Sequence, residues 1–250
     1  MQSVFEKLLF VSSCKGSAFF VLVDPDKVSS DKVSGFADLC AEADVDAFLV
    51  GGSLTFSGHL DELVSSIKKA SGLPVLLFPG NACQISGAAD AILFLSLLTS
   101  RNADFLVGEH VKAAPFIHRW SLEVIPTAYL LVESGPLTSV QFITQSFPIP
   151  RDKIDLAVAH ALAGKYMGMK LVYLEAGSGA VLSVPHQMVE AVSSATALPV
   201  IVGGGVRTAE KAGQLARAGA RFVVVGNALE KDGESSLLGE ISSAVHFLKG

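Results

Sequence analysis

The sequence predicts one α/β domain, a (β/α)8 TIM barrel that spans residues 1–250. The chain has 250 residues, and a barrel of this kind takes about 250. Eight short apolar segments alternate with amphipathic segments, which is the order of parallel strands joined by crossover helices. Half of the residues are hydrophobic and 17% are charged, as expected when strands are buried on both faces. A doubly wound open sheet is the alternative.

The predicted strands are short runs rich in Val, Ile, Leu or Phe, and most of them end at Gly, Asp or Pro. They span 18–23, 47–50, 75–78, 91–95, 124–132, 170–174, 200–202 and 222–225. Helices are predicted where apolar residues recur three and four positions apart. These helices span 31–43, 59–70, 151–166, 187–195, 208–218 and 235–248. Eight such repeats favour the closed barrel over the open sheet.

Two connections depart from this pattern. Residues 79–90, PGNACQISGAAD, show little helical periodicity and are too short for a good crossover helix. We therefore expect a loop or a short extended piece where the barrel would have its third helix. Residues 134–150 contain three prolines and predict a long loop that lies over the face carrying the active site.

Charge and apolar content narrow the class of partner. The net charge is −5 and no run of Lys and Arg stands out, so a nucleic-acid partner has little electrostatic support. No segment reaches about 18 uninterrupted apolar residues, so we expect no transmembrane helix. The apolar start of the chain, residues 1–13, contains Glu6 and Lys7 and is not interpreted as a signal peptide.

The residues that commonly bind metals or form disulfides show no such pattern here. The spacing of Cys14, Cys40 and Cys83 fits neither a zinc site nor a disulfide framework. We expect three buried free thiols, as in the reducing cytoplasm. The six histidines show no paired ligand spacing and are expected at the surface or in the core.

Glycine-rich turns follow the last two predicted strands, Gly203-Gly204-Gly205 after the seventh and Gly226-Asn227 after the eighth. Glycines let backbone N–H groups approach an anion closely, and the helix N-termini that follow favour negative charge. A phosphate site built from these two loops recurs in barrels of this kind. The turns therefore predict a phosphate-binding site, although tight strand-to-helix turns alone would also use glycine.

The sixth predicted strand runs into Glu175 and then into Gly177-Ser178-Gly179. Because barrel chemistry lies at the carboxyl ends of the strands, Glu175 is a candidate general base or an anchor for a hydroxyl group. The alternative is a glutamate that caps or pairs within the barrel. Ser178 and the neighbouring N–H groups add hydrogen-bond donors beside the carboxylate.

Carboxylates and a serine follow the first two strands. The first strand ends in Asp24-Pro25-Asp26, and the second ends in Gly51-Gly52-Ser53. Mg²⁺ binds oxygen ligands and is usually held by one or two protein groups together with substrate phosphates. Asp24, Ser53 and a diphosphate would form such a site, whereas an Asp-Pro turn with a helix cap is the structural alternative.

The motifs VDPDK at 23–27, VGGS at 50–53, YLEAGSG at 173–179, VGGGVRT at 202–208 and VVGNALE at 224–230 resemble the geranylgeranylglyceryl phosphate synthase family. Its relatives include the bacterial heptaprenylglyceryl phosphate synthases. The resemblance covers essentially the whole chain, with the motifs in the right order. The GGG and GN turns also occur in other phosphate-binding barrels, whereas YLEAGSG together with DPDK is specific.

The resemblance implies a magnesium-dependent prenyltransferase that joins sn-glycerol 1-phosphate to geranylgeranyl diphosphate. It would form the ether bond of a membrane lipid and release diphosphate, with Asp24 and Ser53 as magnesium ligands and Glu175 as the catalytic group. The residues that match the glycerol-phosphate site are Tyr173, Leu174, Glu175, Ala176, Gly177, Ser178, Gly179, Gly204, Gly205, Gly226 and Asn227. In this family the third barrel helix is replaced by a non-helical piece, in agreement with residues 79–90.

A polyprenyl diphosphate also needs an apolar groove. Candidate lining residues are Leu97, Leu98, Phe105, Val107, Phe116 and residues 129–132. We expect a homo-oligomer, and a lipid product would allow peripheral contact with a membrane. The alternatives are a synthase that uses a longer heptaprenyl diphosphate, a sugar-phosphate isomerase or aldolase barrel, and a non-catalytic phosphoglycerol-binding barrel.

Overall fold

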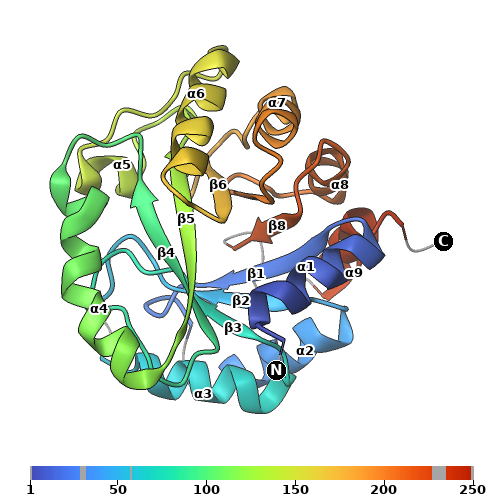
Figure 1. Cartoon of the computed structure of the whole chain (residues 1–250). Helices are drawn as coiled ribbons and strands as arrows, with labels where there is room; N and C mark the ends of the chain where they lie inside the picture. The colour runs from blue at the N-terminus through green and yellow to red at the C-terminus, as the bar shows by residue number, and fades with distance from the viewer. Residues whose placement is uncertain (1, 29–31, 57, 227–234, 249–250) are drawn as a thin grey trace.

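A computed structural model describes residues 2–28, 32–56, 58–226 and 235–248. Eight parallel strands form a closed barrel in the order β1 to β8, and β8 pairs with β1 (Figure 1). The strands are Ala18–Val23, Ala47–Val50, Val75–Leu77, Ala91–Leu97, Glu123–Leu131, Leu171–Glu175, Val200–Gly203 and Phe222–Val225. The predicted (β/α)8 barrel is confirmed, and the open sheet is wrong. The predicted bounds of β1, β2 and β8 agree residue for residue, and those of the other strands differ by one or two residues.

Helices surround the barrel on the outside, as Figure 1 shows. They are α1 Val4–Lys15, α2 Val33–Glu42, α3 Leu60–Ser71, α4 Glu109–Trp120, α5 Ser139–Thr144, α6 Ile154–Tyr166, α7 His186–Thr196, α8 Ala209–Arg217 and α9 Ser235–Val245. A π-helical turn, Asp104–Gly108, leads into α4. All six predicted helices are present, and residues 79–90 between β3 and β4 contain no helix, as predicted.

Three helices escaped the sequence pattern. α1 begins with a capping box in which Ser3 and Glu6 bond to each other's backbone N–H groups. α4 contains Pro115, which obscured its helical pattern. The predicted loop 134–150 contains the short helix α5, so it is not loop throughout. Val140 and Ile143 of α5 line a cavity at the barrel mouth, so this segment does lie over that face.

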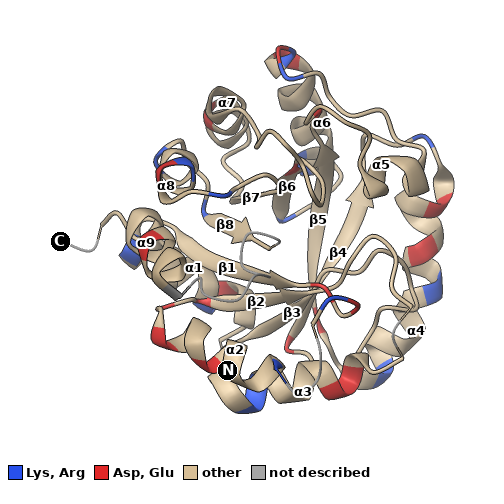
Figure 2. Ribbon diagram, turned by 180° about the vertical axis from the view of Figure 1, so that it is seen from behind, with Lys and Arg blue, Asp and Glu red and all other residues tan. Residues whose placement is uncertain are grey.

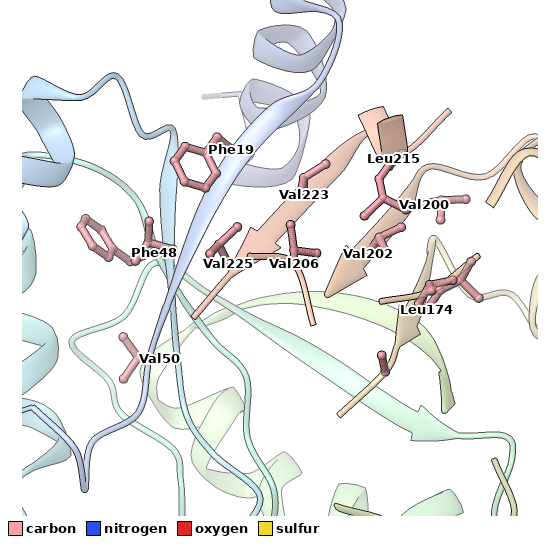
Figure 3. Close-up of a cluster of buried hydrophobic side chains, with 14 of the residues drawn as sticks. Phe19, Phe48, Val50, Leu174, Val200, Val202, Val206, Leu215, Val223 and Val225 are labelled. Atoms are coloured by element: carbon pink, nitrogen blue, oxygen red, sulfur yellow. The ribbon is translucent and has the colours of Figure 1, made fainter. Parts of the chain in front are cut away.

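Strand side chains alternate between two apolar layers. One layer lies between the barrel and its helices and includes Phe19, Phe48 and Leu174 (Figure 3). The other fills the barrel interior, where the rings of Phe20 and Phe222 stack with centroids 4.9 Å apart. The amino-terminal end of the interior is closed by α1, which packs Leu8 into this inner layer. The barrel interior therefore opens at the carboxyl ends of the strands.

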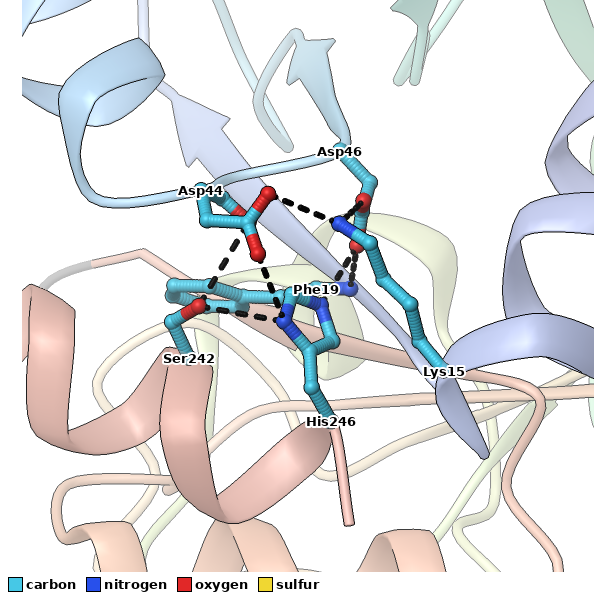
Figure 4. Close-up of polar contacts among 6 residues, drawn as sticks. All are labelled: Lys15, Phe19, Asp44, Asp46, Ser242 and His246. Atoms are coloured by element: carbon cyan, nitrogen blue, oxygen red, sulfur yellow. Dashed lines mark hydrogen bonds and ion pairs between the residues drawn. The ribbon is translucent and has the colours of Figure 1, made fainter. Parts of the chain in front are cut away.

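A buried polar cluster joins the two ends of the chain at the amino-terminal face of the barrel (Figure 4). Asp46 accepts hydrogen bonds from Lys15 Nζ at 2.5 Å, from the Phe19 backbone N–H at 2.8 Å and from His246 Nε2 at 2.8 Å. Lys15 ends α1, and His246 follows α9. Burial lowers the pKa of Lys15, but its hydrogen bonds to Asp46 and Asp44 outweigh that effect and raise it. The cluster thus holds α1 and α9 against the start of β2.

Charged residues lie mainly on the outer helices and loops, where both signs are interspersed (Figure 2). No helix among the described residues has the length and apolar character needed to cross a membrane. The three cysteines are free thiols, as predicted, but only Cys40 is buried. The expectation of burial is wrong for Cys14 and Cys83, because both lie on solvent-facing parts of the outer layer, Cys14 on α1 and Cys83 in the 79–90 segment.

Candidate active site

The predicted site residues meet in one cavity at the carboxyl ends of the strands. Asp24, Glu175 and Gly226 each stand two positions beyond an inward-facing residue of β1, β6 or β8, and Ser53 stands four positions beyond the inward-facing Leu49 of β2, so all four continue the inward-facing positions of the strands. The cavity is lined by ten of the predicted residues, namely Asp24, Ser53, Tyr173, Glu175, Gly177, Ser178, Gly179, Gly204, Gly205 and Gly226. Asn227 lies outside the described residues.

The same alternation separates two predicted residues from the cavity. Leu174 and Ala176 lie one position out of step with Tyr173 and Glu175, and their side chains are buried in the layer between barrel and helices. The prediction that Leu174 and Ala176 belong to the substrate site is therefore wrong for their side chains, because neither residue lines the cavity. The backbone of Ala176 instead joins the loops after β6 and β7, since its N–H donates to the Gly203 carbonyl at 3.1 Å.

Glu175 is a buried carboxylate at the end of β6, with 5% of its surface exposed. Its Oε1 atom accepts a hydrogen bond of 2.6 Å from the Gly177 N–H. Burial raises the pKa of Glu175 from 4.5 to about 7, against the opposing effects of the Gly177 N–H and of the neighbouring Tyr173 hydroxyl. A carboxylate with a pKa near neutrality can accept a proton at physiological pH and release it again.

Three aromatic rings form a neck beside this carboxylate. The ring of Phe78 stacks on Tyr173 with centroids 5.0 Å apart, and Tyr129 meets both rings edge-on, at 5.8 Å from Phe78 and 5.5 Å from Tyr173. Burial, and secondarily the charge of Glu175, raises the pKa of both tyrosines, so their hydroxyls stay neutral. The buried Tyr173 hydroxyl forms no hydrogen bond of standard geometry within the described part of the chain. It is thus a polar group placed to bond a ligand.

The turn after β7 brings the backbone close to Glu175. Gly204 has a φ of 81°, and a Cβ atom at this position would overlap Oε1 of Glu175 and lie 2.7 Å from the Gly177 nitrogen. Only glycine fits here without moving the carboxylate. Arg207 Nη2 donates to the Ala180 carbonyl at 2.9 Å and so ties this turn to the loop after β6. Together the two loops form one wall of the cavity.

Asp24 and Ser53 lie on the opposite wall, at the ends of β1 and β2. Asp24 Oδ1 accepts from the Asp26 N–H at 3.1 Å, and Oδ2 lies 3.4 Å from Lys27 Nζ. Among the described residues no three His, Cys, Asp or Glu side chains gather as a metal cluster. Mg²⁺ nonetheless suits this wall, because the ion usually keeps few protein ligands. The wall offers one carboxylate and one hydroxyl, with room for phosphate oxygens.

An apolar groove of about 760 Å³, including space open to solvent, continues from this cavity. Ser53, Phe78, Tyr129 and Val140 line both spaces, so the aromatic neck joins them. The groove runs between the non-helical segment after β3 and α4, where a regular barrel would hold its third helix. Of the residues predicted to line it, Leu97, Phe105 and Tyr129 do so, whereas Leu98, Val107, Phe116 and residues 130–132 do not.

A histidine is among the residues that line the groove. His110 packs edge-on against Phe94, with ring centroids 4.2 Å apart, and its Nε2 lies 3.2 Å from Ser96 Oγ. Burial lowers the pKa of His110, against the opposing charge of Glu109, so the ring is neutral at pH 7. Phe94 also lines a second cavity, together with Ile117 of α4 and Val124 of β5. Phe94 therefore borders both spaces.

A buried carboxylate, glycine turns for an anion and an adjoining apolar groove define a barrel enzyme that handles a polar and an apolar substrate together. The chain belongs to the PcrB family, whose family model matches residues 13–244, and it is a prenyltransferase. It is 46% identical over 229 residues to the geranylgeranylglyceryl phosphate synthase of Chitinophaga pinensis, covering 92% of this chain and 90% of that one. It is 47% identical over 227 residues to the enzyme of the same name from Pyrococcus horikoshii, covering 90% and 89%.

Solved structures support the same assignment. The (S)-3-O-geranylgeranylglyceryl phosphate synthase of Thermoplasma acidophilum, in complex with its substrate sn-glycerol-1-phosphate, superposes with a TM-score of 0.93 at 37% identity. That similarity covers 99% of this chain and 100% of the other. Tryptophan synthase of Mycobacterium tuberculosis has a TM-score of 0.63 at 14% identity and shares the fold alone.

Proposed function

We propose that this chain joins sn-glycerol 1-phosphate to geranylgeranyl diphosphate, forming geranylgeranylglyceryl phosphate and releasing diphosphate. The observation that carries the proposal is the place of Glu175 in a polar cavity with glycine turns, beside the aromatic neck that leads to an apolar groove. The names of relatives that are 46% and 47% identical support the same reaction.

The glycerol phosphate would bind on the side of the loops after β6, β7 and β8. Gly204, Gly205 and Gly226 let the backbone approach phosphate oxygens, and Ser178 adds a hydroxyl from the loop after β6. The Tyr173 hydroxyl, which neighbours Glu175 and makes no hydrogen bond of standard geometry within the described residues, is a further donor near this site. The T. acidophilum relative was solved with sn-glycerol-1-phosphate bound, which supports this choice of acceptor.

Glu175 would act as the general base. With a pKa of about 7, a large fraction of the carboxylate is ionised at neutral pH and can take the proton of the glycerol C3 hydroxyl. The hydroxyl oxygen then bonds to C1 of the prenyl chain as the bond between C1 and the diphosphate oxygen breaks. The electron pair of that bond leaves with diphosphate, and the proton stays on Glu175 until solvent removes it.

Asp24 and Ser53 would hold Mg²⁺ against the diphosphate, with Lys27 beside Asp24. When bound, the ion supplies charge neutralisation for the departing diphosphate. The residues fit this role, because the pair offers oxygen donors on the wall that faces Glu175 across the cavity.

The apolar groove favours a prenyltransferase over the alternative of a sugar-phosphate isomerase or aldolase. A sugar phosphate has no group that would fill a space lined by Phe94, Leu97 and Phe105. A panel of prenyl diphosphates of increasing length, each with sn-glycerol 1-phosphate and Mg²⁺, tests the proposal. We expect the highest kcat/KM for geranylgeranyl diphosphate. A maximum at heptaprenyl diphosphate would support the longer-chain synthase, and no ether product with any of them would contradict the reaction.

A further inference from the structure

Gln84 is a buried polar residue of the non-helical segment between β3 and β4, with 5% of its surface exposed. Its Oε1 atom accepts two backbone hydrogen bonds, from the Gly52 N–H at 3.2 Å and from the Gly80 N–H at 3.1 Å. Its Nε2 atom donates to the Gly52 carbonyl at 3.0 Å. One side chain thus bonds both backbone polar groups of Gly52, the residue that precedes Ser53.

The backbone around these bonds is packed tightly. A Cβ atom at Gly80 would overlap the Gly52 carbonyl oxygen and lie 2.8 Å from the Ser53 carbonyl oxygen. A Cβ atom at Gly52 would lie 3.3 Å from Oδ1 of Asp24. The segment that replaces the third helix therefore rests directly on the loop that carries Ser53, and that loop rests on Asp24.

We propose that Gln84 is a positioning residue for the diphosphate site: it fixes the backbone of Gly52 and Ser53 so that Ser53 stays in the cavity that Asp24 also lines. This inference rests on the proposed function, because it takes Asp24 and Ser53 as the groups that hold magnesium and diphosphate. Gln84 does not line the cavity, so it acts through the loop and not on the substrate. Residues that orient metal ligands typically contribute about 10–100-fold to metal affinity or activity.

The segment held by Gln84 also forms the wall of the apolar groove. Pro79, Gly80, Asn81 and Ala82 line that groove, and Gly52 and Ser53 line both spaces. The three bonds of Gln84 thus fix the place where the diphosphate end of a prenyl substrate would meet its tail. No such bond reaches the glycine turns after β7 and β8 within the described residues, so the glycerol-phosphate side is independent of Gln84.

Gln84→Met keeps the length of the side chain and removes all three hydrogen bonds. A matched control is Ser86→Ala in the same segment: Ser86 is also buried, but its hydroxyl bonds to Asp61 on α3 and not to the Ser53 loop. Calorimetric titrations of the full chain with inorganic diphosphate plus Mg²⁺, and separately with sn-glycerol 1-phosphate, give a readout that does not depend on turnover. Thermal melting reports the loss of stability in both variants.

We expect Gln84→Met to weaken the binding of magnesium diphosphate by about 10–100-fold and to leave the affinity for sn-glycerol 1-phosphate unchanged. Ser86→Ala should lower the melting temperature without changing either affinity. A folded Gln84→Met protein that binds magnesium diphosphate as the wild type does overturns the inference, as does equal weakening of both ligands. If the wild type binds neither probe, the proposed function fails instead.

Gln84→Glu keeps the proposal testable if Gln84→Met does not fold. A protonated glutamic acid can accept from the two N–H groups and donate to the Gly52 carbonyl, whereas the ionised form cannot donate. Its affinity for magnesium diphosphate, taken as a ratio to the wild type at the same pH, should therefore be close to one at low pH and fall as the pH rises. A ratio near one at every pH contradicts the positioning role.

Discussion

Gly204 lies directly against the carboxylate of Glu175, so closely that any side chain at position 204 would occupy space held by Oε1. The turn after β7 thus has two roles. It offers backbone N–H groups for an anion, and its lack of a side chain leaves space for the Glu175 carboxylate beside the Gly177 N–H. This contact ties the glycine-rich turn to the catalytic group as well as to the phosphate.

Gly204→Ala should therefore lower kcat as well as affinity for glycerol phosphate, because the added methyl group displaces the base. The matched control is Gly168→Ala. Gly168 also has a positive φ, 89°, but a Cβ atom there meets nothing within 4 Å. Both variants should lose about 1–2 kcal/mol of stability from the left-handed backbone, and only Gly204→Ala should lose turnover per folded molecule. Steady-state kinetics and thermal melting of both variants check this prediction. Equal kcat values for Gly204→Ala and Gly168→Ala would show that the contact between Gly204 and Glu175 does not affect turnover.

Much of this site could be predicted from the sequence, because barrel chemistry lies where strands end. Asp24, Ser53 and Glu175 each follow an apolar run, and the structure brings them to one cavity. The strict alternation of a strand also excludes Leu174 and Ala176 from the cavity, a distinction that treating residues 173–179 as one motif missed.

Other features depend on barrel closure and have no local signal. The rings of Tyr129 and Tyr173 come from β5 and β6, the ring of Phe78 comes from the residue after β3, and the three meet only because the sheet closes. Gln84 bonds Gly52 across 32 positions, and no periodicity marks it. α1 was missed because its apolar face resembles any short hydrophobic stretch. Only the closed barrel shows that this helix covers the barrel end.

Asp24→Asn should lower turnover by orders of magnitude, since it removes the carboxylate that faces the diphosphate site. EDTA should abolish turnover in the wild type, and added Mg²⁺ should restore it. Asp26→Asn is the control: it removes a carboxylate from the same loop, and Asp26 does not line the cavity. Wild-type activity that persists in EDTA would contradict the magnesium assignment.

Phe94→Ala should enlarge the apolar groove toward the second cavity, because Phe94 borders both spaces. The ratio of kcat/KM for heptaprenyl diphosphate to that for geranylgeranyl diphosphate should then rise, because the longer tail gains space. Phe116→Ala removes a ring from α4 that lines neither space and should leave the ratio unchanged. An unchanged ratio in a folded Phe94→Ala protein would show that another residue limits chain length.

Asp46→Asn should destabilise the protein without affecting the site at the other end of the barrel. Asp46 neutralises Lys15 and bonds His246, and breaking a buried pair costs about 3–5 kcal/mol. Asp44→Asn should cost much less, because the Asp44 side chain is 46% exposed. Thermal melting compares the two variants, and a normal melting temperature for Asp46→Asn would refute the role of the cluster.

The pKa of Glu175 also predicts how stability depends on pH. Folding raises the pKa from 4.5 to about 7, so the native state binds the proton more tightly than the unfolded chain does. This contribution is fully present below pH 4.5 and is lost as the pH rises through 7. Glu175→Gln lacks it, so the melting temperature of the variant relative to the wild type should increase between pH 4.5 and pH 7.5. A constant difference would mean that the carboxylate does not titrate in this range.

The most direct test of the account is kcat for Glu175→Gln, measured with sn-glycerol 1-phosphate, geranylgeranyl diphosphate and Mg²⁺ on protein shown to be folded by melting. Glutamine keeps the shape of the side chain and cannot take a proton. If Glu175 is the general base, kcat falls by about 10²–10⁴-fold while the fold persists. A normal kcat in a folded Glu175→Gln protein would remove Glu175 from the mechanism and contradict the central claim.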